Sequence, residues 1–321
     1  MPRRLLAWGN NVARALDPTS EEPLLSAPVD ITKATGCDEV VHHSWACTIG
    51  RNRTSGKLSA WGIHPLIPDG YIGQLDMPSP RKVLGVGQPA GFLLPDGTIR
   101  DLAGRTSSRI CQDVVITEQG DTYTFQDGVG LSHFTSLADL LETAAGTSMA
   151  HPLLPLSNLE LYATESRAFV LARGVMPLLF EIHTLEGHKP CPPRLEVVSG
   201  LEGVGIASIV AGSSNRLGVV SDAGEAWILG RRGEPELQEV DGDIEFLGLG
   251  SAFEVVVTDA AAWVRGKNDF GQLGIRDQDT TEDWVGLSGL SGRVVDVVSA
   301  RWSTIVTVED DSDDEQQLGG S

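Results

Sequence analysis

The sequence predicts an all-β fold, a seven-bladed β-propeller, and three observations carry this prediction. A strand–turn–strand unit recurs seven times, and the 37 Gly and 17 Pro residues are spread along the whole chain. The copies are spaced by about 43 residues on average, a period typical of propeller blades. Abundant Gly and Pro favour short strands joined by tight turns over long helices. Helical repeats of similar period would show a 3.6-residue apolar spacing, which is absent here.

Each unit reads as an apolar strand, a Gly or Asp turn, a second strand and, in the clearest copies, a Gly stop. The clearest copies are the fifth and the sixth, at residues 212–230 and 250–274. In chain order the units are residues 40–49 with 57–62, 83–94 with 98–102, 110–117 with 122–125, 159–171 with 178–182, 212–222 with 224–230, 250–259 with 261–274, and 294–308.

The spacing of the units is uneven at one place. Aligned at the residue that opens the apolar strand, the units give Trp45, Ala90, Gln112, Arg167, Arg216, Phe253 and Trp302. Gln112 follows Ala90 by 22 residues and precedes Arg167 by 55. Because the third unit is compressed, a count of six blades stays open.

The last unit lacks a second hairpin strand, and the N-terminus can donate it. The segment from Arg4 to Asn11 carries Trp8-Gly9, which repeats the Trp-Gly ending of Trp61-Gly62. Pairing this strand with the last unit would satisfy an open sheet edge. We therefore expect one propeller domain over residues 1–308, closed by its N-terminal strand, and a disordered acidic tail over residues 309–321.

One internal segment, residues 126–158, falls outside the repeat. It contains a helix signal near residues 137–145, in which Ser136 and Asp139 have capping-box spacing and Leu137, Leu140 and Leu141 share one face. We predict a single short helix there.

Composition limits the functional classes. The formal net charge of −20 would repel a phosphate backbone, which disfavours direct binding to nucleic acid. No apolar stretch has the length of a membrane span or of a signal-peptide core. Cys37, Cys47, Cys111 and Cys191 form no C-x-x-C pair, so we expect buried free thiols and no zinc knuckle. Together these features favour a soluble protein of the cytoplasm, the nucleus or both.

The twelve residues Trp263-Val-Arg-Gly-Lys-Asn-Asp-Phe-Gly-Gln-Leu-Gly274 carry a family resemblance. They resemble the signature of regulator-of-chromosome-condensation repeats, in which a Trp-Gly-x-Asn core leads into Gly-Gln-Leu-Gly. Trp8-Gly9 and Trp61-Gly62 are partial echoes. Within that family the bare propeller plan is similar to the alpha-tubulin suppressor branch, also called killer-toxin-insensitivity accessory proteins.

The resemblance to this branch implies a non-catalytic scaffold that binds a small zinc- or iron-binding diphthamide-biosynthesis factor, and we expect the chain to be a monomer. Through that partner it would support Elongator-dependent modification of the tRNA wobble uridine and diphthamide synthesis. The family's founding member is a guanine-nucleotide exchange factor that binds nucleosomes, so exchange on a small GTPase and a chromatin-associated adaptor are the alternatives. The basic tail and wedge hairpin of that founding member are not visible here, although residues 103–158 have room for a wedge.

No sequence pattern points to an enzyme, a cofactor or a metal. The chain has no P-loop, no G-x-S-x-G elbow and no H-E-x-x-H motif. His42 and His43 are adjacent, and neighbouring side chains on a strand point to opposite faces, so we do not expect them to share a metal.

The candidate partner site is the ring of aligned positions at one rim of the central channel. We predict an aromatic arc of Trp45, Phe253 and Trp302 beside a basic arc of Arg167 and Arg216. Aromatic and Arg side chains are enriched in binding hot spots. The alternative is that these large residues only fill the channel. Trp227 and Trp263 recur on the second hairpin strand and are predicted to be core residues.

Overall fold

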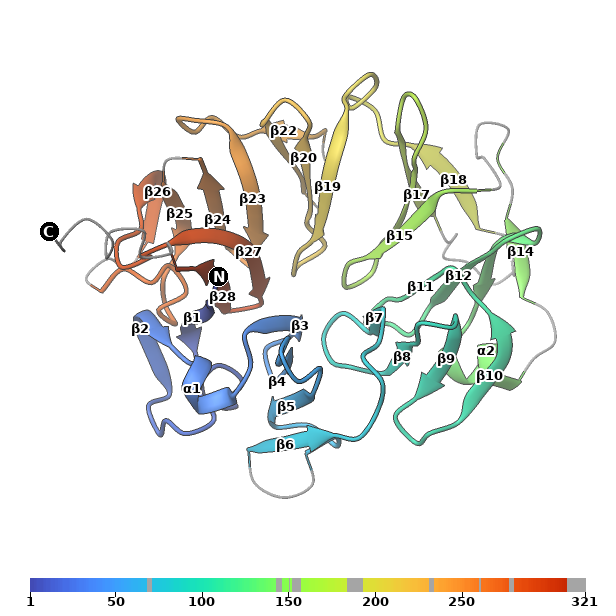
Figure 1. Ribbon diagram of the computed structural model, residues 1–321. Helices are drawn as coiled ribbons and strands as arrows, with labels where there is room; N and C mark the ends of the chain where they lie inside the picture. The colour runs from blue at the N-terminus through green and yellow to red at the C-terminus, as the bar shows by residue number, and fades with distance from the viewer. Residues whose placement is uncertain are drawn as a thin grey trace, which may run out of the picture.

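Seven four-stranded antiparallel sheets surround a central axis in the computed structural model (Figure 1). The structure describes residues 1–67, 71–142, 146–149, 151, 157–183, 193–230, 234–259, 261–276 and 280–310. In six of the sheets, four strands consecutive in sequence pair in order from the axis outward. The seven-bladed propeller is therefore confirmed, and the six-bladed count is wrong.

We number the blades in the order of the sequence units, and each blade runs from its inner strand to its outer strand. Blade 1 is β3 (Glu39–His43), β4 (Cys47–Arg51), β5 (Leu58–Gly62) and β6 (Ile72–Leu75). Blade 2 is β7 (Lys82–Leu84), β8 (Gly91–Leu93), β9 (Thr98–Asp101) and β10 (Thr106–Ile110). Blade 3 is β11 (Asp113–Ile116), β12 (Thr122–Gln126), β13 (Gly130–Phe134) and β14 (Thr147–Met149). Blade 4 is β15 (Leu159–Ala163), β16 (Ala168–Ala172), β17 (Leu178–His183) and β18 (Arg194–Val197).

Blade 5 is β19 (Ile206–Ala211), β20 (Leu217–Ser221), β21 (Ala226–Leu229) and β22 (Glu236–Leu237). Blade 6 is β23 (Ile244–Leu249), β24 (Phe253–Thr258), β25 (Ala262–Lys267) and β26 (Thr280–Gly286). Blade 7 combines β27 (Arg293–Ala300) and β28 (Ser303–Glu309) with β1 (Arg3–Asn10) and β2 (Leu24–Asp30).

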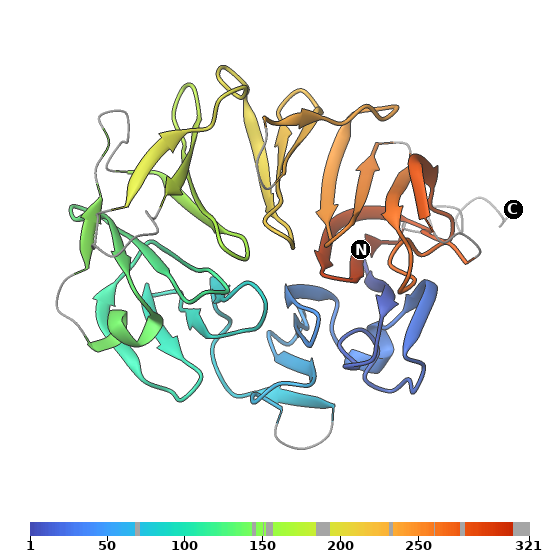
Figure 2. The ribbon, with the colours of Figure 1, turned by 180° about the vertical axis from the view of Figure 1, so that it is seen from behind.

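The two ends of the described chain close the ring within blade 7. Strand β1 pairs with β28 from Arg3↔Glu309 to Gly9↔Ser303, and β2 adds the outer strand (Figure 2). The predicted closure is confirmed, although the N-terminal segment supplies two strands rather than one. The expected boundary at residue 308 is one residue short of the strand end, because Glu309 lies in β28 and accepts from Arg3 Nε at 2.8 Å. Residues 311–321 of the predicted tail lie outside the described residues.

The core lies between the blades. Each of the seven main clusters of buried apolar side chains joins two neighbouring sheets, so apolar packing continues around the whole ring. Phe253 of blade 6, for example, packs in one cluster with Leu6 and Trp8 of blade 7. Within the described residues, each blade therefore buries one face against the blade before it and the other against the blade after it.

Two buried tryptophans explain the Trp-Gly motif. Trp8 donates from Nε1 to the carbonyl oxygen of Gln272 in blade 6 at 2.9 Å, and Trp61 donates to Leu16 in blade 7 at 3.0 Å. Each indole therefore ties its own third strand to an outer loop of the preceding blade. We call this contact the tryptophan clamp. The glycine after each tryptophan has positive φ, and a Cβ at Gly62 would lie 2.2 Å from the carbonyl oxygen of Ala46.

Blade 3 corrects two sequence predictions. Residues 110–117 were aligned with the second strand of a blade, but β11 (Asp113–Ile116) is the inner strand, and β12 is the second. Gln112 consequently lies at the opposite end of the blade from the other aligned positions, where its N–H donates to the carbonyl oxygen of Phe125. Residues 126–158 are not outside the repeat either, because they contain β13 and β14 of this blade.

The predicted helix is α2 (Leu137–Glu142), which packs against β10 of blade 2 and β13 of blade 3. Among the described residues, a second short helix is α1 (Thr32–Thr35). Ser136 Oγ accepts from the N–H of Asp139 at 3.0 Å, as the capping box predicts. The carboxylate of Asp139 in turn accepts from the N–H of Thr135, one residue earlier than the motif requires. The helix ends at Glu142, and residues 143–145 of the predicted span lie outside the described residues.

Three of the four cysteines are buried and free: Cys37, Cys47 and Cys111. This confirms the prediction for these three, while Cys191 lies outside the described residues. Burial raises the pKa of the Cys47 thiol to about 12. None of the described helices is long and apolar enough to cross a membrane.

Candidate functional site

Six of the seven aligned positions lie on one face of the ring, where the first strand of each blade turns into its second. Since strand direction alternates, the loop between the third and fourth strands lies on the same face. We call the first and second strands of a blade A and B, and the face with the turns between them the AB face. Trp45, Arg167, Arg216, Phe253 and Trp302 all come from its turns. Gln112 is the aligned residue that the structure places at the other face.

Arg167 and Arg216 do not form an open basic arc, so this part of the prediction is wrong. Arg167 makes two 2.7 Å contacts with the carboxylate of Glu181, and its Nη1 donates to the carbonyl oxygen of Gly230 at 2.8 Å. Arg216 pairs with Glu254 in blade 6. The two side chains are only 15% and 16% exposed. Their charges are neutralised, and both fasten one blade to the next.

Phe253 is fully buried, so its side chain is not available to a partner. The reason is a difference in register between the turns. Phe253 opens β24 and pairs with Gly266, whereas the equivalent residue of blade 1 is Cys47, which opens β4 and pairs with Gly62. Trp45 lies two residues earlier, in the turn itself, and is 40% exposed.

Trp45 and Trp302 remain accessible and belong to a larger surface. The ring of Trp302 lies 5.3 Å from that of Phe270, and the guanidinium of Arg301 lies 5.2 Å from the Trp302 ring. Exposed apolar side chains continue on both sides of this pair, over three adjacent blades. We call this set, together with the half-buried Trp302 of blade 7, the apolar arc, and its exposed members are Phe270 from blade 6, Val12 from blade 7, and Trp45, Ile63 and Tyr71 from blade 1.

Short contacts hold the arc together. The N–H of Asn10, two residues before Val12, donates to the carbonyl oxygen of Trp302 at 2.9 Å. In blade 1, the N–H of Ile63 donates to Ala46, the residue after Trp45, at 2.7 Å. The guanidinium of Arg14 covers the ring of Tyr71 at 4.1 Å and joins blade 7 to blade 1. These contacts fix the backbone beside Trp302 and Ile63 and join the outer loop of blade 7 to that of blade 1.

The central channel opens beside the arc. Turns of six blades line its mouth, including Trp45, Glu118, Glu165 and Arg301. Arg301 Nη2 lies 4.0 Å from a carboxylate oxygen of Glu165 across the opening. The mouth thus carries carboxylates and one guanidinium beside the aromatic side chains.

His42 and His43 both border the channel, and they pair with Ile49 and Thr48, which are consecutive residues of β4. The β-bulge of β3 lies between Val40 and His42, so it does not disturb the alternation of the two histidines. The ring nitrogens of His43 lie 2.7 Å from Thr48 Oγ1 and 2.9 Å from Ser303 Oγ. Burial lowers the pKa of His43 to about 3 and that of His42 to about 4. Within the described ranges, no group of three or more His, Cys, Asp or Glu is placed to hold a metal.

Sequence reasoning missed Phe270, Ile63 and Val12. Phe270 lies inside the twelve-residue signature, directly before the Gly-Gln-Leu-Gly loop, and is 38% exposed. Val12 and Ile63 follow the glycines of the two Trp-Gly pairs by three residues and one residue. The signal that could have identified Val12 and Ile63 is an apolar residue in the outer loop, shortly after the glycine of a Trp-Gly pair.

No protein-family model matches the sequence. No curated protein matches it either. Among solved structures, the chain is similar to human WBSCR16, with 14% identity, a TM-score of 0.67, and coverage of 97% of this chain and 100% of that one. It is also similar to Prp20p of Saccharomyces cerevisiae, described with its binding properties to Gsp1p and histones, with 11% identity, a TM-score of 0.67, and coverage of 98% and 93%.

A second structure of the yeast protein, described as yeast RCC1 (Prp20) bound by Kap60, matches with 11% identity, a TM-score of 0.68, and coverage of 97% and 90%. The class defined by the fold is therefore the seven-bladed β-propeller. Within that class, the chain has the propeller fold of yeast RCC1 over nearly its whole length. The likeness at these identities establishes the fold alone.

Proposed function

We propose that this propeller is a non-catalytic protein-interaction scaffold whose partner docks on the AB face over the apolar arc. The observation that carries the proposal is that loops of three adjacent blades, from Phe270 to Tyr71, place exposed aromatic and aliphatic side chains on the same face. Contiguous apolar patches on a water-soluble surface are typical of interaction sites. Trp and Tyr are among the residues most often found in hot spots, and Arg301 adds a guanidinium at the centre.

For the partner, we propose the small zinc- or iron-binding diphthamide-biosynthesis factor, on the sequence resemblance alone. The propeller would then support Elongator-dependent tRNA modification and diphthamide synthesis, as a monomer in the cytoplasm, the nucleus or both. The three buried free thiols are compatible with a reducing compartment.

A second candidate is exchange of guanine nucleotide on a small GTPase. It is favoured by the shared fold with Prp20p, which is described with binding to Gsp1p and histones. The same description, together with the net charge of −20, keeps a chromatin-associated adaptor as a third candidate, since an acidic surface attracts basic histone segments.

The test is affinity purification of the tagged full chain from native lysate, with and without added guanine nucleotide. The binding variant is Trp45→Ala with Trp302→Ala. The matched control is Val129→Ala with Val175→Ala, because both residues are exposed and lie in loops on the opposite face. Circular dichroism would first establish that both double variants are folded.

Removing two hot-spot tryptophans should cost about 2 kcal/mol or more of binding free energy, a loss of affinity of roughly thirtyfold. The proposal predicts that the diphthamide factor is recovered with the natural chain and the control but lost with the binding variant. Recovery of a small GTPase that nucleotide releases would replace the scaffold role with exchange. A partner retained equally by both double variants would mean that the apolar arc is not the docking surface.

A further inference from the structure

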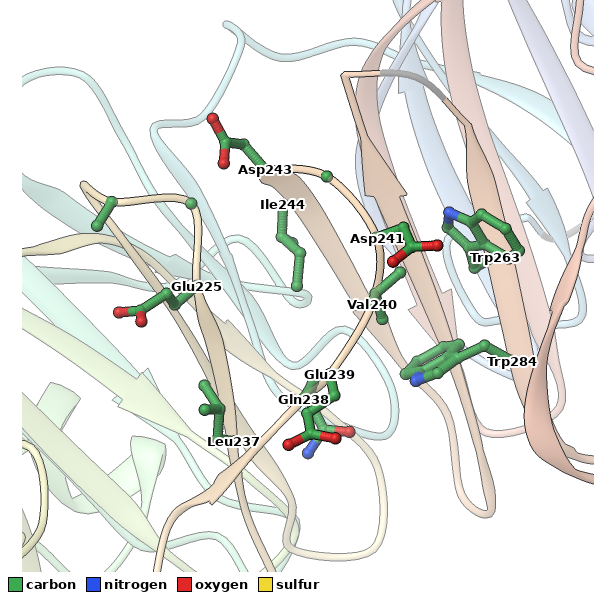
Figure 3. A pocket seen from close by; sticks show the side chains of 13 residues that line it. Glu225, Leu237, Gln238, Glu239, Val240, Asp241, Asp243, Ile244, Trp263 and Trp284 are labelled. Atoms are coloured by element: carbon green, nitrogen blue, oxygen red, sulfur yellow. The ribbon is translucent and has the colours of Figure 1, made fainter.

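A second site lies on the face opposite to the AB face, between blades 5 and 6. It is a pocket of about 560 Å³, within the size range of ligand sites. Trp263 from β25 and Trp284 from β26 form one wall, and residues 237–244, which lead from blade 5 into blade 6, form the other (Figure 3). We call it the tryptophan pocket.

Trp263 lines this pocket because blade 6 departs from the tryptophan clamp. The glycines that end the third strands, Gly9, Gly62 and Gly266, are equivalent, since each pairs with the first residue of its second strand. The residue before Gly266 is Arg265, which donates to Gln238 of blade 5 at 2.7 Å in place of the indole clamp. Trp263 lies two residues earlier on the same side of the strand, near the other face.

The predicted core role of Trp263 is therefore corrected: the residue is half-buried and lines a cavity. Its cross-strand partner in β26 is Gly286, which has no side chain to cover the indole. The Nε1 atom of Trp263 is buried, and no hydrogen-bond partner for it exists among the described residues. A buried donor without an acceptor is costly, and a main-chain carbonyl oxygen of a bound peptide would remove that cost, whereas a cationic side chain has no acceptor to offer.

The rim of the pocket is acidic. Glu225, Glu239, Asp241 and Asp243 are exposed, and within the described part of the chain none of them forms an ion pair. The carboxylate of Asp241 faces the Trp263 indole, while the others lie at separate points around the opening (Figure 3). Carboxylates beside indole faces attract cations and repel anions.

One indole of the pocket already binds a cation. The guanidinium of Arg265 lies 4.5 Å from the ring centroid of Trp284, within the range of a cation–π contact. The same wall therefore has the chemistry to hold a second cationic group on its open side.

We propose that the tryptophan pocket binds a basic peptide segment of a partner protein, with a Lys or Arg side chain against the Trp263 and Trp284 indoles. A peptide fits better than a small organic cation because the carboxylates do not converge on one point. Three of the four are alternate residues of the segment 239–243, so the negative charge is spread along this segment rather than gathered at one point (Figure 3). The site is separate from the apolar arc, so it does not depend on the proposed function.

The test uses the full chain at low ionic strength and a capped six-residue peptide of alternating Lys and Gly. A Gln–Gly peptide is the neutral counterpart, and tetramethylammonium is the small cation. Calorimetry measures affinity, and nuclear magnetic resonance follows the indole N–H signal of Trp263, assigned with Trp263→Phe. The pocket variant is Asp241→Asn with Asp243→Asn. The control with the same change of net charge is Glu22→Gln with Asp76→Asn, two exposed carboxylates of blade 7 and blade 1.

We expect the Lys–Gly peptide to bind about tenfold more weakly to the pocket variant and less than about twofold more weakly to the control. The reason is that carboxylates in contact with the peptide attract it more strongly than distant carboxylates, whose attraction is screened by salt. The Trp263 signal should shift with the Lys–Gly peptide and not with the Gln–Gly peptide. Equal weakening of both double variants, or an unmoved Trp263 signal, would overturn the site. Tetramethylammonium binding as tightly as the peptide would overturn the choice of ligand.

Discussion

The tryptophan clamp makes a quantitative prediction for Trp8. Its side chain is fully buried, donates to the carbonyl oxygen of Gln272 at 2.9 Å, and has its ring against Gly274 of the signature loop. Trp8→Phe removes the hydrogen bond, leaves a buried carbonyl without its donor and opens a small cavity. Together these effects should lower the free energy of unfolding by about 2 kcal/mol. Trp8→Ala should cost about 3–5 kcal/mol.

Urea unfolding followed by far-ultraviolet circular dichroism measures this loss without relying on the fluorescence of the altered residue. Trp61→Phe serves as a replicate, because Trp61 is equally buried and makes the same contact with Leu16 at 3.0 Å. Trp45→Phe is the control, since Trp45 is 40% exposed, and it should change stability by less than about 0.5 kcal/mol. If Trp8→Phe and Trp61→Phe were both as stable as the natural chain, the clamp would not hold the blades together.

Three further predictions concern single residues. Gly62→Ala should lower the free energy of unfolding in urea by more than about 2 kcal/mol, because its Cβ would lie 2.2 Å from the Ala46 carbonyl oxygen. Gly56→Ala is the control: Gly56 has a φ of 71° and nothing within 4 Å of the position that a Cβ would take, so the loss should be about 1 kcal/mol. Burial lowers the pKa of His43 to about 3, so as pH falls the unfolded chain is protonated at this residue before the folded chain is. The free energy of unfolding should therefore fall as pH drops from about 6.5 toward 3. His43→Gln should make that decrease smaller between about pH 7 and 5, as urea unfolding at each pH would measure. The Cys47 thiol, with its pKa raised to about 12, should resist alkylation at pH 8 until urea unfolds the chain, as peptide mass mapping would detect.

The sequence was sufficient for the fold where the repeat kept its turn chemistry. Gly224 marks the turn between β20 and β21, Gly266 lies next to the end of β25, and Trp8-Gly9 predicts the closing strand. These signals are local, because a positive φ restricts the residue type at that position whatever its neighbours are.

Blade 3 could not be read in the same way. Its inner strand carries Val114, Val115 and Ile116, as apolar as the second strand of other blades, and the turn that follows contains Gly120 and Asp121. A first hairpin with this composition is indistinguishable from a second hairpin by pattern alone. Only pairing with β13 and β14 fixes the register.

The predicted site failed for a different reason. Position in the repeat indicated which residues come from the AB turns, but it could not show that Glu181 and Glu254 neutralise Arg167 and Arg216 from adjacent strands and blades. Nor could it show that the turn before Phe253 places that residue in the core rather than in the loop. Pairing across blades and exact turn register are tertiary properties, and one sequence does not encode them in any local pattern.

Departures from the repeat, rather than the repeat itself, mark the surfaces that are free to bind. Wherever a blade follows the pattern, its large side chains are used between blades, as Trp8 and Trp61 are. Trp45 and Trp302 lie in turns outside that packing, and Trp263 is left over because Arg265 takes the clamp position. The interfaces between blades already bury the apolar faces of the sheets. An indole that lies outside these interfaces therefore adds little to the stability of the fold. Its exposure is therefore better explained by a ligand or partner than by folding.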